Sequence, residues 1–517
     1  MKRTVFYTSI LVCFIAGFAW VSAGISALDD DWGHLKLASN GLGFLLTTGW
    51  EGLAGQGGYY RPVVVVSLYL NHLIGGTEPW GYHVVNVVIH AFCSGLVLLL
   101  GMRLGMNRRA SIGASFLFFV LPIHSDTVFW IVGRTDSVCA LFYFGSLILF
   151  VKALDRPDKW QYILLSLCAG LAFLSKEMAL SLPGILILLA WHRNRRLKDS
   201  LFPIGAVVGV LMLYFALRGV VLGSLFGGTP GIEFSPVRWG IDLAKSFAKF
   251  GMTDLKWFGV PVLALTGAVC FRERGGSFFS RRSPVYVLAL LCTASLVPVL
   301  GHLHNWYLYI PSCFFCLAVA QVWLGGSGRA FLFACLLLYY TQVLLREGFY
   351  WRDASRLSEQ FVDQILPLAQ TTRGRLFVMN TPSAWTPGRS LSGKPLYAFA
   401  LKNAVSMRSQ TAELGEVVMV NHVWMTGDRT RCAGVREDRT FHLQILEGGF
   451  FSFHGGGEGW VAPFVLQRDW GTLTVASNLD MTVVVDLEEE DRAVFFDGTA
   501  VRSFQPAEII RTGDKVQ

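Results

Sequence analysis

The sequence predicts a polytopic α-helical membrane protein with a small C-terminal extracytoplasmic β-rich domain. Of the 517 residues, 53% are hydrophobic and only 15% are charged, whereas soluble proteins carry about 25% charged residues. Apolar runs recur through residues 1–350, and alternating runs typical of strands follow them. These observations exclude a large soluble enzyme, a disordered protein and a nucleic-acid-binding protein.

The distribution of charge divides the chain into two parts. Residues 1–351 contain 27 Lys and Arg and 16 Asp and Glu, whereas residues 352–517 contain 17 and 20. We therefore expect a transmembrane domain over residues 1–350 and a soluble domain over residues 351–517. The net charge of +8 reflects basic cytoplasmic loops that follow the positive-inside rule, so it predicts no affinity for nucleic acid.

About eleven membrane spans are expected, with the amino terminus in the cytoplasm and the basic clusters on one side. They are residues 5–21, 82–102, 111–122, 137–151, 162–174, 178–191, 202–217, 257–270, 285–300, 309–324 and 330–345. Residues 63–74 are too short to span and are expected at the interface. The sequence Val21-Ser22-Ala23 leaves open that the first run is a signal peptide. An odd number of spans places the C-terminal domain outside the cytoplasm.

The C-terminal domain is expected to contain strands and shows no catalytic motif. The strands are expected at residues 375–379, 416–420, 441–446, 472–476, 481–487 and 493–496. Cys432 is the only cysteine of this part, so it has no internal disulfide. The sequence contains no fixed-period repeat, P-loop or dinucleotide-binding GxGxxG after a strand, which argues against cytoplasmic nucleotide chemistry.

The first outer loop contains three adjacent carboxylates, Asp29, Asp30 and Asp31. Because adjacent carboxylates repel one another, at least one of their pKa values should rise. A carboxylate at a dry, partly buried site is a general base suited to a hydroxyl acceptor. The alternative is a solvated acidic loop or a helix cap.

The second outer loop, residues 122–136, contains His124, Asp126, Arg134 and Asp136. An Arg at the membrane surface suits a phosphate, because the guanidinium makes bidentate charge-assisted hydrogen bonds. The alternative is a structural pair between Arg134 and an Asp.

Two further outer turns and Arg61 add polar groups to the same side of the membrane. Lys176 and Glu177 are adjacent, and could instead form a simple interface anchor. His302 and Tyr307 lie in a turn rich in aromatic residues, for which an aromatic belt is the alternative. An acid cluster and several cations on one membrane surface suit a lipid-phosphate substrate that meets an extracytoplasmic acceptor.

Five stretches of the sequence resemble, in the same order, a known family. They are Tyr60-Arg61-Pro62, residues 81–86, residues 122–136, Leu174-Ser175-Lys176-Glu177 and residues 306–312. They resemble the membrane part of the transmembrane-and-TPR O-mannosyltransferases and their bacterial relatives, which belong to the GT-C superfamily. The resemblance covers roughly residues 1–350. No TPR repeats follow here, so a protein, a glycan and a lipid all remain open as acceptors.

The resemblance implies a hexosyl- or pentosyltransferase that uses a polyprenyl-phosphate-linked donor. In this superfamily an acidic pair in the first outer loop carries the catalytic Asp, which corresponds to Asp29 and Asp30. The basic residues near the lipid phosphate correspond to Arg134 and to Lys176 or Arg61. The other polar residues of the outer loops are expected in the substrate pocket: Asp31, His124, Asp126, Asp136, Glu177, His302 and Tyr307.

The expected reaction is an inverting transfer, in which an Asp activates or orients the acceptor and the polyprenyl phosphate leaves. A divalent cation, Mg²⁺ or Mn²⁺, is left open because several superfamily members dispense with one. We expect a bacterial inner-membrane protein whose site faces the periplasm.

Two other functions stay open. A transporter or flippase for a lipid-linked sugar would need polar groups near the membrane midplane and, often, inverted repeats. A noncatalytic membrane assembly factor would use the C-terminal domain as a binding module and would tolerate changes in the Asp triplet.

Overall fold

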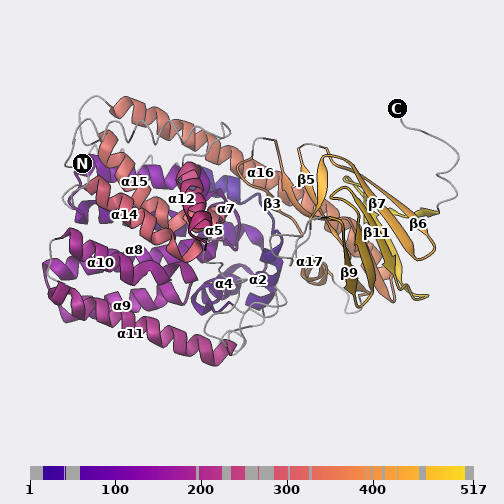
Figure 1. Cartoon of the computed structure of the whole chain (residues 1–517), viewed down its shortest axis with the longest axis horizontal. Coiled ribbons are helices and arrows are strands. Elements are labelled where there is room, and N and C mark those ends of the chain that lie inside the picture. Colours follow the sequence, from indigo (N-terminus) through magenta and orange to yellow (C-terminus); the bar gives the residue numbers. More distant parts are fainter. Residues whose placement is uncertain are drawn as a thin grey trace. The chain divides into compact units, whose positions relative to one another are not determined.

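In the computed structural model, the chain folds into two compact units (Figure 1). The structure describes residues 15–39, 41, 59–193, 197–223, 235–250, 266, 284–300, 303–324, 329–388, 390–397, 400–409, 414–427, 429–452 and 462–506. The first unit contains Met1–Ile25 and Leu37–Phe349, and the second contains Ser26–Lys36 and Tyr350–Gln517. The acidic stretch of the first outer loop therefore belongs with the C-terminal strands.

The first unit consists of helices. They are residues 15–22, α4 (Pro62–Gly75), α5 (Pro79–Arg103), α6 (Arg108–Val120), η1 (Pro122–His124), α7 (Ser125–Phe129), α8 (Arg134–Asp155), α9 (Lys159–Phe173), η2 (Glu177–Ser181), α10 (Leu182–His192), α11 (Leu197–Leu222), α12 (Pro236–Phe250), α14 (Pro284–Leu296), η4 (Val297–Val299), η5 (Asn305–Leu308) and α15 (Tyr309–Leu324). Helix α16 (Ala330–Thr371) begins in the first unit and ends in the second.

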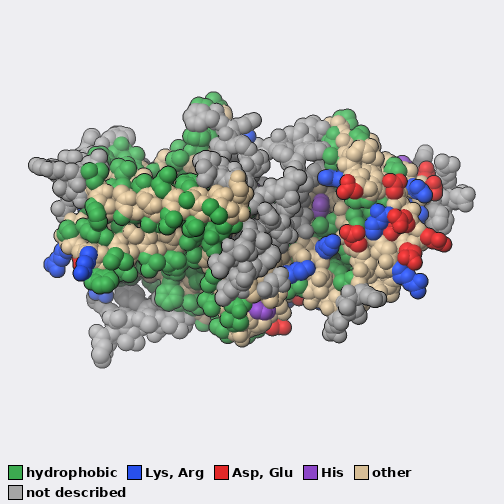
Figure 2. All heavy atoms as spheres, turned by 90° about the horizontal axis from the view of Figure 1, so that it is seen from below, with side chains coloured by type: hydrophobic (Ala, Val, Ile, Leu, Met, Phe, Trp, Pro, Cys, Tyr) green, Lys and Arg blue, Asp and Glu red, His purple; other side chains and the backbone are tan. Residues whose placement is uncertain are grey.

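Long apolar helices make the first unit a multi-pass membrane domain. Within the described ranges, five helices are long and apolar enough to span a membrane, or six if the bent pair Arg108–Val120 and Pro122–Phe129 is one span. The five contain the expected spans 82–102, 137–151, 202–217, 309–324 and 330–345. Figure 2 shows hydrophobic side chains over much of one face of this unit, with a group of Lys and Arg at one end of that face.

The remaining expected spans are short or lie outside the described residues. Helix α9 has 15 residues, which corresponds to about 22 Å against a hydrocarbon core of about 30 Å. The helices at 177–192 and 284–299 are also shorter than a full span. The expected span 257–270 lies outside the described residues except for residue 266. The number of about eleven spans therefore stays a prediction.

A bend after α6 shapes the second outer loop. The chain turns by 47° between α6 and the helical residues Pro122–Phe129, at a proline that has no N–H for the preceding turn. Gly133 then allows a close approach, because a Cβ there would collide with the backbone of Asp126 and Thr127. The loop therefore folds back on itself immediately before α8 begins at Arg134.

Helix α12 lies in a segment that we expected to be only a long outer loop. One face is exposed, with Val237 at 74% and Ile241 at 49% of full exposure, whereas Asp242 and Phe250 are buried. The Phe250 ring stacks on Phe315 of α15 at 4.9 Å. The helix therefore has one face on the membrane domain and one turned outward.

Among the described residues, the second unit contains three sheets, which agrees with the β-rich prediction. The orders are β13-β12-β1-β4, β14-β6-β7-β11-β10-β9 and β3-β2-β5-β8. The strands are β1 (Arg375–Met379), β2 (Thr381–Thr386), β3 (Lys394–Pro395), β4 (Glu416–Met419), β5 (His422–Thr426), β6 (Arg431–Glu437), β7 (Thr440–Glu447), β8 (Gly449–Ser452), β9 (Phe464–Arg468), β10 (Gly471–Val475), β11 (Asp480–Val485), β12 (Arg492–Phe496), β13 (Val501–Ser503) and β14 (Gln505–Pro506). All six expected strands are confirmed as β1, β4, β7, β10, β11 and β12.

A pair of buried asparagines lets two strands pass from one sheet to the next. Strand β1 is parallel to β4, and after one bend β2 is parallel to β5. At the bend Asn380 has φ 57°, a conformation that Asn tolerates. The Asn421 Oδ1 atom accepts from the Asn380 backbone N–H at 2.9 Å, and its Nδ2 donates to Asn380 Oδ1 at 2.9 Å. This pair satisfies polar groups that burial would otherwise make costly.

Candidate functional site

The acid loop, residues Ser26–Lys36, ends in helix α2 (Asp30–Ser39). The Asp31 carboxylate accepts a hydrogen bond from the Leu28 N–H at 3.0 Å, which makes it a cap of the helix start. Asp29 has φ 44° and is 3% exposed. Two acids at the first turn of α2 are also favoured by the helix dipole. The helix-cap alternative therefore describes Asp31, and it leaves Asp29 and Asp30 for other roles.

Asp30 differs from its two neighbours in exposure. Its side chain is half-buried, whereas Asp29 and Asp31 are buried. Burial raises the pKa of the Asp30 carboxyl to about 6. A carboxylate whose pKa approaches the working pH is a better general base than an ordinary one. Its partial exposure and its raised pKa thus suit Asp30 to proton transfer.

A second set of charged residues gathers in the membrane unit. We call Arg61, Asp136, Lys176, Glu177 and Arg218 the cation cluster. Lys176 Nζ lies 2.6 Å from Asp136 Oδ2, and both side chains are at most 5% exposed. Glu177 Oε2 lies 2.6 Å from Arg61 Nη2, and its Oε1 lies 3.2 Å from Arg218 Nη1. The cluster therefore contains three cations and two carboxylates.

Electrostatic coupling joins these pairs into one group. Burial lowers the pKa of the Lys176 amine, an effect that Asp136 opposes and Arg61 reinforces. Burial would raise the pKa of Glu177, but the charge and hydrogen bond of Arg61, together with the charge of Arg218, hold that pKa below its usual value. Arg61 and Glu177 are the more accessible members, at 11% and 29% side-chain exposure. Lys176 and Arg218 are less accessible, at 5% and 4%.

Aromatic rings surround the cations of this cluster. Lys176 Nζ lies 5.0 Å from the centre of the Tyr307 ring, and the Arg61 guanidinium lies 4.2 Å from that of Tyr59. The structure thus brings the predicted residues Arg61, Lys176 and Tyr307 together, although they come from three distant parts of the sequence. His302, predicted beside Tyr307, lies outside the described residues.

Sequence reasoning missed Arg218, which lies near the end of α11. The expected span 202–217 ends one residue before Arg218. The signal that could have found it is its position as a lone Arg at the end of an apolar span, where charged residues are costly and usually functional.

Arg134, predicted to bind the donor phosphate, is fully buried and bonded to neutral acceptors. Its Nε donates to Asn86 Oδ1 at 2.7 Å, and its Nη2 donates to Asn71 Oδ1 at 2.9 Å and to the Tyr82 carbonyl at 2.7 Å. Its Nη1 donates to the Ser67 carbonyl at 3.3 Å. These contacts join α4, α5 and α8. A direct role in phosphate binding stays a prediction, and the geometry favours a role in fixing these helices.

The predicted residues His124 and Asp126 lie in the folded-back second loop and are buried. His124 Nε2 lies 2.8 Å from Ser312 Oγ, and its ring packs against Tyr309 at 4.5 Å. His90 joins this group, with Nδ1 2.6 Å from the Tyr309 hydroxyl. These contacts are those of a hydrogen-bonded core, and a place for His124 and Asp126 in a substrate pocket stays a prediction.

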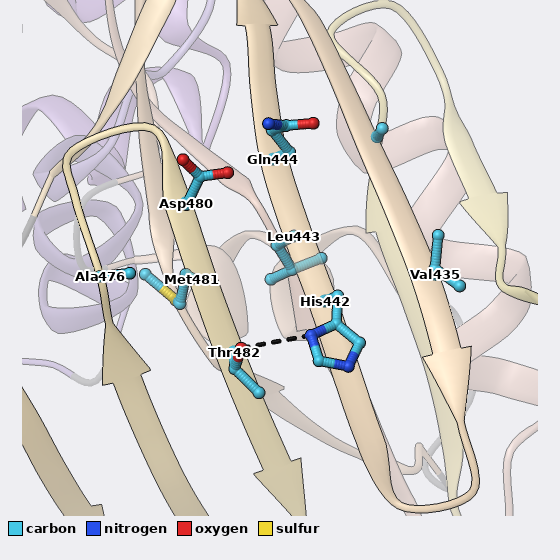
Figure 3. Close-up of a pocket in the computed structure, with 9 residues that line it drawn as sticks. Val435, His442, Leu443, Gln444, Ala476, Asp480, Met481 and Thr482 are labelled. Carbon is cyan, nitrogen blue, oxygen red and sulfur yellow. Dashed lines mark hydrogen bonds between the residues drawn. The ribbon is translucent and has the colours of Figure 1, made fainter. Parts of the chain in front are cut away.

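The six-stranded sheet of the C-terminal unit contains a groove of about 240 Å³ (Figure 3). Strands β6, β7 and β11 line it, and His442 Nδ1 lies 3.2 Å from Thr482 Oγ1. Asp480 is the one carboxylate among its lining residues. The groove lacks the buried charge of the cation cluster. Within the described ranges, no three His, Cys, Asp or Glu side chains are arranged to hold a metal ion.

Part of the membrane domain is similar to known proteins. The family model described as dolichyl-phosphate-mannose-protein mannosyltransferase matches residues 62–217. The match begins one residue after Arg61 and ends one residue before Arg218, so it encloses the other members of the cation cluster. The resemblance to GT-C glycosyltransferases is confirmed.

Individual relatives agree with this GT-C assignment. Protein O-mannosyl-transferase TMTC2 of Homo sapiens is 37% identical over 131 residues, which cover 24% of this chain and 16% of that protein. Protein O-mannosyl-transferase TMTC4 of Homo sapiens is 35% identical over 147 residues, covering 24% and 20%. The chain thus spans a fifth or less of the length of these relatives.

The fold has a counterpart among solved structures. The structure of ArnT from Cupriavidus metallidurans in the apo state matches with a TM-score of 0.50 and 12% identity. The match covers 82% of this chain and 93% of that chain. At this identity the likeness concerns the GT-C fold alone.

Proposed function

We propose that this protein transfers a sugar from a polyprenyl-phosphate-linked donor to an extracytoplasmic acceptor. The cation cluster carries this proposal, because buried charge in a membrane domain is costly and is usually retained for function. Three of its five residues, Asp136, Lys176 and Glu177, lie within the range that the mannosyltransferase family model matches. The relatives named protein O-mannosyl-transferase support a glycosyl transfer, with mannose as one candidate sugar.

In this proposal the cations of the cluster bind the donor phosphate. Arg61, the more accessible cation, contacts the phosphate oxygens, and the more deeply buried Lys176 and Arg218 add positive charge to the site. When the bond between sugar C1 and the phosphate oxygen breaks, the electron pair remains on the phosphate. Fixed cations stabilise this developing charge more than they stabilise the intact donor, and this difference is what accelerates the reaction.

Asp30 is the proposed base. Its carboxylate accepts the proton of the acceptor hydroxyl while the acceptor oxygen forms a bond to C1 from the side opposite the phosphate. The half-buried position and the pKa of about 6 support this assignment over Asp31, which caps α2. A single displacement of this kind inverts the configuration at C1. Asp29 remains the alternative base, and a divalent cation between Asp and phosphate stays open.

The proposed setting is the bacterial inner membrane, with the reaction on the periplasmic side. The basic clusters of the sequence support this orientation through the positive-inside rule. A flippase function is less well supported, because the charged residues of the cation cluster lie at helix ends and in turns: Arg61 precedes α4, and Lys176 precedes η2.

The test is a transfer assay on the full chain in detergent or nanodiscs, with a polyprenyl-phosphate-mannose donor and release of polyprenyl phosphate as the readout. Asp30→Asn should reduce the rate by about 10²–10⁴-fold. Asp353→Asn, an exposed Asp on α16, is the matched control and should behave as wild type. If Asp30→Asn and Asp29→Asn both retain full activity, the acid loop is not catalytic.

Donor preference is tested in the same assay. Nucleotide-linked sugars should not replace the polyprenyl-linked donor. If no lipid-linked sugar is consumed while the protein still moves such a lipid across a vesicle membrane, the flippase alternative replaces the transferase.

A further inference from the structure

The acid loop is anchored to the C-terminal domain over its whole first half. Residues Ala27 and Leu28 are fully buried and belong to the same compact unit as Tyr350–Gln517. Ser26 Oγ donates a hydrogen bond to Glu359 Oε1 on α16. The Asp29 backbone N–H donates to the Leu396 carbonyl at 2.9 Å. Two hydrogen bonds thus hold the segment that precedes Asp30.

The segment that receives the acid loop is itself fixed. The Leu396 N–H donates to the Ser383 carbonyl at 2.9 Å, and the Tyr397 N–H donates to the Pro382 carbonyl at 3.0 Å. These bonds extend the pairing of β3 with β2. The Tyr397 side chain is fully buried, and its hydroxyl lies 2.7 Å from Ser358 Oγ on α16. Leu396 and Tyr397 therefore continue the sheet that contains β2 and β3, and a side-chain hydrogen bond attaches them to α16.

Asp29 has a backbone conformation that needs such support. A φ of 44° is uncommon for a residue other than glycine, and it persists where surrounding contacts hold it. Asp29 is also close enough to Tyr397 to act on its titration electrostatically. The contacts that hold Asp29 therefore also fix the direction in which the chain enters α2 at Asp30.

We propose that the C-terminal domain positions the catalytic carboxylates, with Glu359 and Tyr397 as positioning residues. This inference rests on the proposed function, because it requires a catalytic residue in the acid loop. A carboxylate displaced by about 1 Å can lose about 10²-fold in rate. The C-terminal domain accordingly affects kcat whichever acceptor is used.

The experiment compares conservative and disruptive changes at the Ser26–Glu359 hydrogen bond in the full chain. Glu359→Leu removes the acceptor and should lower kcat about 10- to 100-fold, with the KM for polyprenyl-phosphate-mannose unchanged within twofold. Glu359→Gln keeps an acceptor oxygen and should restore most of kcat. At the other end of the hydrogen bond, Ser26→Ala removes the donor and should lower kcat, whereas Ser26→Thr keeps a hydroxyl donor and should restore most of kcat.

Tyr397→Phe is the second variant and should also lower kcat without changing KM. Tyr162→Phe on α9 is its matched control and should equal wild type. Membrane insertion and thermal unfolding are measured for each variant, so that rates are compared only among folded proteins. A rise in KM with unchanged kcat would contradict a positioning role, and so would wild-type kinetics in Glu359→Leu, Ser26→Ala and Tyr397→Phe.

The outcome separates this inference from the proposed function. If Asp30→Asn is inactive and the positioning variants are fully active, only the inference fails. If both Asp30→Asn and Asp29→Asn are fully active, the proposed function fails, whatever the positioning variants do.

Discussion

Ion pairs in the two units of the molecule can differ strongly in how deeply they are buried. In the membrane unit the Lys176–Asp136 pair is 2.6 Å long, with side chains 5% and 4% exposed. In the C-terminal unit the Arg356–Asp353 pair is 3.2 Å long, with side chains 68% and 50% exposed. Figure 2 shows Lys, Arg, Asp and Glu intermixed on the strands of the C-terminal unit. These two ion pairs therefore differ in burial as well as in length.

This difference indicates which charges have a function. An exposed pair costs little and contributes about 0–1 kcal/mol, so its presence carries little information. A buried pair requires the removal of two ions from water, and apolar residues often serve stability as well or better. In the C-terminal unit Asp29 and Asp31 of the acid loop are buried as well, as is Lys394. Burial therefore selects candidate residues in both units, and the contacts of each residue decide among them.

The largest effect on stability is expected at the cation cluster. Lys176→Met removes the partner of Asp136 and leaves a buried carboxylate, which should lower the free energy of unfolding by about 3–5 kcal/mol. Thermal unfolding in detergent measures this loss. The double variant Lys176→Met/Asp136→Leu should recover much of the stability but not the activity. Recovery of both would show that the pair is only structural.

Arg134 and Arg61 should separate structure from donor binding. Arg134→Met leaves several buried acceptors without their donor, and should lower the free energy of unfolding by about 2 kcal/mol or more. Its donor KM should change less than that of Arg61→Met. The comparison needs unfolding curves and donor titrations of both variants. A large rise in KM for Arg134→Met at wild-type stability would instead support Arg134 as the phosphate ligand.

The pH dependence of turnover should follow Asp30. A base must be ionised, so the rate should fall about tenfold for each pH unit below the pKa of about 6. Stability should move the other way: because the folded state raises this pKa above 3.8, the free energy of unfolding should increase as pH falls through about 6. The measurements are kcat and chemical unfolding from pH 4.5 to 8. An acid limb near pH 4 would contradict the assignment.

The smallest effect is expected at the exposed pair on α16. Arg356→Ala should change the free energy of unfolding by about 0.5 kcal/mol or less, because the pair is solvated and screened by salt. Chemical unfolding at low and high salt measures it. A loss as large as that of Lys176→Met would remove the contrast between the two units.

Local patterns predicted much of the fold. Apolar runs located five helices that could span the membrane, and alternating runs located six strands. Strand pairing was not predictable in this way, because β1 pairs in parallel with β4 and β12, which are distant in sequence. Helix α12 was missed because its apolar residues are spread over one face rather than forming a run.

The candidate site was predictable in composition but not in arrangement. Residue types and their outer positions brought Arg61, Lys176 and Glu177 to attention. The acceptors of Arg134 come from other helices, so its burial could not be predicted from the loop that contains it. The packing of the acid loop against Leu396 joins residues more than 350 positions apart, and no local pattern indicates it.

The most direct test of the account is a comparison of donor binding with turnover. Binding of polyprenyl phosphate is measured by calorimetry for wild type, Asp30→Asn and Arg61→Met in matched nanodiscs, alongside sugar transfer. The account predicts that Asp30→Asn binds the lipid as wild type does but does not transfer sugar, whereas Arg61→Met binds it at least about tenfold more weakly. Normal lipid binding by Arg61→Met together with normal transfer by Asp30→Asn would contradict it.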